Sequence, residues 1–147
     1  MVTLKSGNTQ FNFEVTTLER IKFIETYAGR PLDESGSYHL YIGRNIPDRN
    51  NPGQVLREIT TEELNNFFTS RTKVVNNTIV PLFQGFTRIP CIGFWDGAIE
   101  NSEQVIIFRV PLRDILLFCF SYIREFDQDA VYVEVLNSTQ FIVERGK

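Results

Sequence analysis

Two residues that could carry acid–base chemistry lie in separate segments of alternating polar and apolar residues. His39 is the one histidine among 147 residues, and Glu134 lies in a β-branched segment near the C-terminal end. A histidine beside a carboxylate on a neighbouring strand can act as a general base that the carboxylate orients. His39 and Glu134 are therefore the candidate catalytic residues. The structural alternative is a hydrogen-bonded polar patch at an interface, because clusters of ionisable groups also have structural roles.

Five further residues are candidates for holding a ligand, and they are Tyr41, Arg44, Trp95, Arg109 and Tyr132. Arg44 and Arg109 can bind a carboxylate or phosphate with the planar guanidinium group. Arg44 lies at the end of a strand, where it could instead hold the loop over residues 45–55 by bonding its carbonyl oxygens. Trp95 comes just before the turn signal Asp96-Gly97. It either lines a pocket with its indole N–H or packs within a hairpin.

The composition argues against several other chemistries. A zinc site usually needs three or four Cys or His ligands, whereas the chain offers only His39, Cys91 and Cys119. The two cysteines have no CxxC spacing, and we expect Cys119 to be buried and inert. The formal net charge of −3 argues against a nucleic-acid surface. Because no phosphate-binding loop, dinucleotide fingerprint, EF-hand or zinc-protease string is present, we expect neither a metal nor a cofactor.

The sequence predicts a soluble, cytoplasmic protein. Its longest apolar run, Ile115 to Phe120, has six residues, whereas a membrane-spanning helix needs roughly 18. The first residues, Met1 to Ser6, lack the apolar core of a signal peptide. Two cysteines in a chain of this length fit a reducing compartment better than a disulfide framework.

The elements that must position these residues fall into an extension, residues 1–36, and a core, residues 37–147. In the extension, short alternating runs on either side of Gly7-Asn8 predict a hairpin. Thr16 and Glu19 form a capping box that predicts a helix over 17–28. We expect this hairpin and helix to pack on the core.

In the core, periodicity predicts strand, helix, strand, strand, helix and strand. Their expected ranges are 37–42, 61–72, 86–95, 104–110, 112–126 and 130–136. We expect an exposed loop over 43–55, an edge position or bulge at Pro90, and a last short strand over 141–143 that pairs with the N-terminal hairpin. The order predicts an α+β fold of ferredoxin-like βαββαβ type, an antiparallel sheet with both helices on one face.

Alternation within the strands predicts which side chains face the helices and which face away. Those expected to face the helices are Leu40, Ile42, Ile106, Phe108, Val110, Val131, Val133 and Val135. Those expected on the open face are His39, Tyr41, Val105, Ile107, Arg109, Tyr132 and Glu134. Apolar residues on the open face suggest that something covers it.

The helix over 112–126 has apolar residues on two sides. Its main stripe consists of Leu112, Ile115, Leu116, Cys119, Ile123 and Phe126. Leu117 and Phe118 fall near the far side, and a helix that is apolar on both sides is buried on both sides. We therefore expect Leu117 and Phe118 to form an interface, covered by the N-terminal extension, by a second subunit or by another protein.

Several short motifs between Leu40 and Val131 follow one another in a recognisable order. They are Leu40-Tyr41-Ile42-Gly43-Arg44, Thr60-Thr61-Glu62-Glu63-Leu64 with Phe67-Phe68, Pro81-Leu82-Phe83 with Gly85-Phe86-Thr87, Gly93-Phe94-Trp95, and Phe126-Asp127-Gln128-Asp129-Ala130-Val131. Over about two thirds of its length the chain resembles the bacterial family described as domain of unknown function 3574. The chain departs from that family at Glu100-Asn101-Ser102-Glu103-Gln104, where the family pattern has Arg-Glu and Ser-Lys. The resemblance implies the same fold and singles out Arg44, Thr87, Trp95 and Gln128, but it implies no activity.

Two functions from different classes agree with these observations. The first, which we favour, is a non-catalytic module that acts by assembly as a homodimer or with a protein partner, and that also binds a small anionic or aromatic ligand. The second is a small cofactor-free enzyme with a pocket on the open face, in which His39 or Glu134 is the base and Arg44 or Arg109 holds an anion. An enzyme requires a concave pocket that joins His39, Tyr41 and an arginine.

Overall fold

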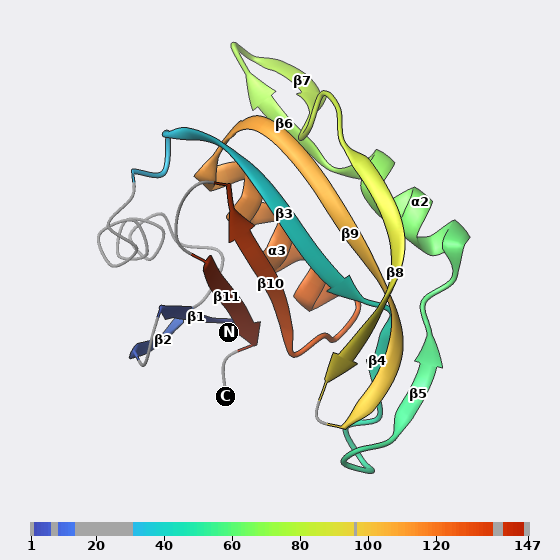
Figure 1. Cartoon of the computed structure of the whole chain (residues 1–147). Coiled ribbons are helices and arrows are strands. Elements are labelled where there is room, and N and C mark those ends of the chain that lie inside the picture. Colours follow the sequence, from blue (N-terminus) through green and yellow to red (C-terminus); the bar gives the residue numbers. More distant parts are fainter. Residues whose placement is uncertain (1, 7–8, 14–30, 96, 137–139, 146–147) are drawn as a thin grey trace.

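The computed structural model describes residues 2–6, 9–13, 31–95, 97–136 and 140–145 (Figure 1). This part of the chain is an α+β structure with two helices and antiparallel sheets. The helices are α2 (Thr61–Ser70) and α3 (Leu112–Glu125). The strands are β1 (Val2–Ser6), β2 (Thr9–Phe13), β3 (Ser35–Gly43), β4 (Asn45–Pro47), β5 (Val55–Glu58), β6 (Thr72–Val75), β7 (Thr78–Pro81), β8 (Thr87–Trp95), β9 (Ala98–Pro111), β10 (Ala130–Val135) and β11 (Gln140–Arg145).

Seven strands form the main sheet, in the order β2-β1-β11-β10-β3-β9-β8. The predicted N-terminal hairpin is confirmed as β1 and β2, and the predicted last strand, β11, pairs with β1. Strand β8 lies at the edge of the sheet, the position predicted from Pro90, because proline cannot donate to a ladder on both sides. Helix α3 lies behind the sheet in Figure 1, and the opposite face carries neither described helix. The predicted helix over 17–28 lies outside the described residues.

Helix α2 begins where the sequence predicts. Thr60 accepts a hydrogen bond from the Glu63 backbone and the Glu63 side chain accepts one from the Thr60 backbone, so the capping box is present. The helix ends at Ser70 because the chain turns into the β6–β7 hairpin, which we did not predict. Asn76 and Asn77 at its turn both have positive φ, 51° and 61°, the geometry that tight hairpins favour. The predicted loop over 43–55 is also partly wrong, since β4 lies within it and pairs with β5.

Strands β3 and β10 have the predicted orientation, whereas β9 is reversed from Val105 to Phe108 and agrees with the prediction at Arg109 and Val110. Leu40, Ile42 and the three valines of β10 are buried as expected. In β9, however, Val105 and Ile107 are buried and Phe108 is 59% exposed. The register between β3 and β9 shifts beside Gly36 and Tyr38, and Arg109 has a φ of 57°. This bulge adds one residue to β9, which is why Val110 is buried although it lies an odd number of positions from Ile107.

Phe118 is covered within the chain itself, which corrects the expectation of an interface there. Its side chain is 0% exposed. Its ring centroid lies 5.5 Å from that of Phe67, 5.2 Å from that of Phe68 and 5.6 Å from that of Phe83. Helix α2 and the segment before β8 thus supply the cover, rather than the extension, a second subunit or another protein as the sequence predicts. Leu117 is partly buried, and its place in an interface stays a prediction.

The main stripe of α3 is buried as predicted, from Leu112 to Phe126. Neither helix of the described segments is long and apolar enough to span a membrane.

Candidate functional site

His39 and Glu134 face each other across β3 and β10, as the sequence predicts. Their Cα positions are paired in the register, and His39 Nδ1 lies 2.9 Å from Glu134 Oε1. Both side chains are partly exposed on the face opposite the helices, 21% and 32% respectively. The pair has the geometry in which a carboxylate orients an imidazole ring.

The two arginines proposed to hold an anion do not join this pair. The Arg44 guanidinium donates from Nε and Nη2 to the Ile59 carbonyl, at 3.1 and 2.7 Å, and its Nε lies 3.7 Å from Glu58 Oε1. Arg44 therefore binds a backbone carbonyl, as the structural alternative predicts, but that carbonyl belongs to Ile59 and not to the loop over residues 45–55. Arg109 is exposed at the bulge of β9.

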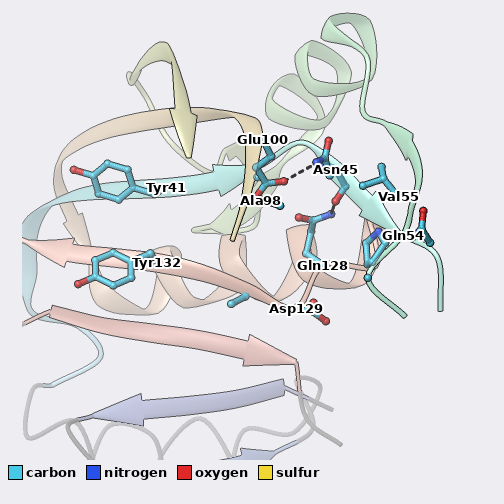
Figure 2. A pocket seen from close by; sticks show the side chains of 13 residues that line it. Tyr41, Asn45, Gln54, Val55, Ala98, Glu100, Gln128, Asp129 and Tyr132 are labelled. Atoms are coloured by element: carbon cyan, nitrogen blue, oxygen red, sulfur yellow. Dashed lines mark hydrogen bonds between the residues drawn. The ribbon is translucent and has the colours of Figure 1, made fainter. Parts of the chain in front are cut away.

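A cavity of about 520 Å³ lies on the face opposite the helices, where β3 ends and β4 begins (Figure 2). Tyr41 and Tyr132 line one end, Gln54 and Val55 line the other, and Glu100 lies between them. The cavity thus contains two of the predicted ligand-binding residues. Of the residues described, neither His39, Arg44 nor Arg109 lines it.

The two tyrosines form an aromatic end wall. They are partners in the register of β3 and β10, and their ring centroids are 6.0 Å apart in an edge-to-face arrangement. Gln104 Nε2 donates a hydrogen bond of 3.0 Å to the Tyr41 hydroxyl. In Figure 2 both hydroxyls point away from Glu100, so ring carbons lie nearest to the middle of the cavity.

Glu100 supplies the central carboxylate, and the sequence did not single it out. The Asn45 backbone N–H donates to its Oε2 at 3.3 Å. Gly43 leaves the space that it occupies, because a Cβ at that position would lie 2.5 Å from Glu100 Oε1. Burial raises the pKa of this carboxyl above its ordinary value, and the Asn45 hydrogen bond opposes the rise only in part. No lysine or arginine among the described residues forms an ion pair with it.

Gln128, which the family resemblance singled out, lies beside Glu100. It is buried, and its Nε2 donates both hydrogens, to the Asn45 carbonyl at 2.9 Å and to the Phe126 carbonyl at 3.0 Å. These two acceptors fix the orientation of the amide. Its oxygen Oε1 therefore lies on the side of Glu100 (Figure 2).

A loop over residues 48–54 forms the far rim of the cavity. Arg49 ties it to the turn that follows α3, donating to the Asp127 side chain at 3.2 Å and to the Asp129 side chain at 2.6 Å. Asp48 accepts hydrogen bonds from the Asn50 backbone and the Asn51 side chain, which lower its pKa. The loop thereby positions Gln54 and Val55.

The remaining candidates lie elsewhere. Trp95 ends β8 and pairs with Ala98, but its side chain is outside the described residues. Cys119 is buried as expected, and burial raises the pKa of its thiol far above the ordinary value. Burial and the charge of Glu103 also raise the pKa of Cys91, so neither thiol is activated as a nucleophile. In the described segments no group of His, Cys, Asp and Glu side chains is placed to hold a metal ion.

Comparisons with protein-family models, with curated proteins and with solved structures gave no match. The geometry of the cavity is therefore the basis for inferring a function.

Proposed function

We propose that this protein is a non-catalytic module that binds a small organic molecule in the cavity beside Tyr41 and Tyr132. The cavity itself carries the proposal, since its volume of about 520 Å³ falls in the range that proteins use for small ligands. Its lining combines ring surface from the tyrosines with polar groups from Glu100 and Gln128. A largely apolar wall with a few polar groups is typical of sites that orient a bound molecule.

We also propose that the fold is ferredoxin-like. The spatial order β10-β3-β9-β8 supports it, as do α2 between β3 and β8 in the chain and α3 between β9 and β10. The hairpins β4–β5 and β6–β7 are then additions to this plan. The motifs that resemble the domain of unknown function 3574 lie in or beside β3, α2, β8 and β10, and on the basis of that resemblance we propose membership of that family.

The second candidate is a small cofactor-free acid–base enzyme, and the 2.9 Å contact between His39 and Glu134 favours it. Such an enzyme needs its base beside the bound substrate. His39 is not among the described residues that line the cavity, and neither is an arginine. We therefore prefer the binding module.

The proposal is tested by screening a fragment library against the full chain with ligand-detected NMR. Ala130→Phe adds a ring inside the lining, so the fragments that bind the wild type should no longer bind this variant. His39→Asn changes a residue outside the lining and should keep them, and melting temperatures verify that both variants fold. Binding that survives Ala130→Phe, or that His39→Asn abolishes, would overturn the proposal.

We further propose that the protein assembles through the end of the β8–β9 hairpin. Ile92, Phe94 and Ile99 are 73%, 68% and 71% exposed there, and the register puts Phe94 opposite Ile99. Large apolar side chains gathered on one face favour contact with another protein surface. Light scattering after size exclusion should give a dimer that Phe94→Ser converts to a monomer, whereas a wild-type monomer at high concentration contradicts a homodimer.

Both cysteines are free thiols. This supports our proposal of a reducing, cytoplasmic location.

A further inference from the structure

We infer that the cavity binds an organic cation, with an ammonium group against Glu100 and Gln128 and an apolar body toward Tyr41 and Tyr132. This inference depends on the proposed function and adds the chemical class of the ligand to it.

The hydrogen-bonding groups at the centre of the cavity are acceptors. Gln128 donates both of its amide hydrogens to backbone carbonyls, so only its oxygen can form a hydrogen bond with a ligand. Glu100 accepts one backbone hydrogen bond at Oε2, and its Oε1 has no partner among the described residues. A ligand that satisfies these two groups must donate hydrogen bonds, as an ammonium does with its N–H groups.

The charge of the lining also favours a cationic ligand. Its ionised groups are the carboxylates of Glu100 and Asp129, and within the described part of the chain it contains no lysine, arginine or histidine. Arg49 lies 2.6 Å from Asp129 and balances that charge. Among the described groups of the lining, the carboxylate of Glu100 is left uncompensated, so it attracts a cation and repels an anion. An anionic ligand was one of the two kinds expected from the sequence, beside an aromatic one.

Two carboxylates that are more deeply buried than the half-buried Glu100 are each paired with a cation of the protein. Arg88 binds Glu103 with two hydrogen bonds, at 2.6 and 3.0 Å. Lys73 Nζ lies 2.5 Å from Asp114 Oδ2. Removing a carboxylate from water is costly unless a cation pairs with it. Glu100 differs from both in having no such partner among the described residues, and a ligand ammonium would supply one.

The aromatic end wall suits the rest of such a ligand. Ring carbons of Tyr41 and Tyr132 lie toward the cavity, and they offer apolar surface together with the negative ring face that attracts cations. An aromatic amine could therefore place its ring at this wall and its ammonium at Glu100.

The inference is tested with three probes that share an indole ring and differ in charge. These are tryptamine, tryptophol and indole-3-propionate, each titrated into the ¹⁵N-labelled full chain at neutral pH. Tryptamine should bind about tenfold more tightly than the neutral tryptophol, and indole-3-propionate should bind most weakly. The amide signals of Gly43, Asn45 and the Gln128 side chain should shift.

Glu100→Gln preserves the shape of the side chain and removes its charge, so the preference for tryptamine over tryptophol should disappear. Glu125→Gln makes the same change in total charge at an exposed position of α3 and should leave the preference intact. If tryptophol or indole-3-propionate binds at these residues as well as tryptamine does, the cation assignment is wrong although the binding site stands. If no probe shifts these signals, the inference fails, whereas the proposed function is decided separately by whether Ala130→Phe abolishes fragment binding.

Discussion

Glu100 and Glu103 are three positions apart on β9, yet their surroundings differ in the one respect that matters for binding. Glu103 points toward the helices, where Arg88 satisfies both of its oxygens. Glu100 points toward the cavity, where the described residues offer it a backbone N–H and no cation. The first carboxylate is compensated by its own protein and the second is not. This difference is the physical basis for a ligand site at Glu100.

The unpaired carboxylate should lower stability at neutral pH. Burial raises the pKa of Glu100 in the folded protein. Below the pKa of the unfolded chain the carboxyl is neutral and costs the folded protein nothing. As the pH rises through the folded pKa, the carboxyl becomes charged and the folded protein loses stability. Glu100→Gln should therefore raise the melting temperature at pH 7 by about 2 °C. The gain in melting temperature should vanish below about pH 4, where the Glu100 carboxyl is neutral in both the folded and the unfolded protein.

Two other ionisable groups face Glu100 and stay in place in this variant. Asp129 lines the same cavity. The pKa of Tyr122 is raised by burial and by the charges of Glu103 and Glu100. Calorimetry at several pH values measures the difference, and a Glu100→Gln variant that is less stable than the wild type at pH 7 would count against the desolvation argument.

The bulge in β9 is an irregular element outside the cavity lining. The bulge in β9 lets Arg109 take a left-handed backbone conformation with a φ of 57°, which a glycine adopts freely and a β-branched residue resists. Arg109→Val should lower the free energy of unfolding by about 1–2 kcal/mol, whereas Arg109→Gly should change it by less than about 1 kcal/mol. Urea denaturation compares the two variants, and equal losses would mean that the bulge imposes no constraint.

The loop over residues 48–54 is held by Arg49 at its rim and by three backbone hydrogen bonds of its own. Arg49→Ala should speed amide hydrogen exchange at Asn51 and Gln54 while leaving exchange in α2 unchanged, because the lost contacts are exposed and local. Arg57→Ala removes another exposed ion pair, to Glu63, and serves as the control. Unchanged exchange in the loop after Arg49→Ala would show that Arg49 does not hold the rim.

At the scale of the molecule, one aromatic cluster joins α2, α3 and the segment before β8. Phe118 lies at its centre, so Phe118→Ala should leave a cavity and lower the free energy of unfolding by about 3–5 kcal/mol. Phe108→Ala removes the same ring from an exposed position and should change it by less than about 0.5 kcal/mol. Similar losses in both variants, measured by denaturant titration, would contradict this description of the core.

Regular elements were predictable from the sequence because periodicity and capping are local. Alternation oriented β3 and β10 correctly, and the Thr60 and Glu63 pair marked the start of α2. The bulge at Arg109 was not predictable, since one inserted residue reverses the faces without changing the residue types. Tyr41 and Tyr132 were expected on the open face from alternation, and both lie there. Glu100 was missed because its segment, from Ala98 to Glu103, does not alternate clearly enough to be read as a strand.

The central claim is that Glu100 forms the ligand site, and the carboxyl ¹³C chemical shift of Glu100 tests it most directly. The shift, followed against pH, gives the pKa of this group with and without saturating tryptamine. In the free protein the pKa should lie above the ordinary value of 4.5. Tryptamine should lower it, because an ammonium beside the carboxylate favours the charged form. A pKa that tryptamine leaves unchanged, while it binds elsewhere or not at all, would contradict the account.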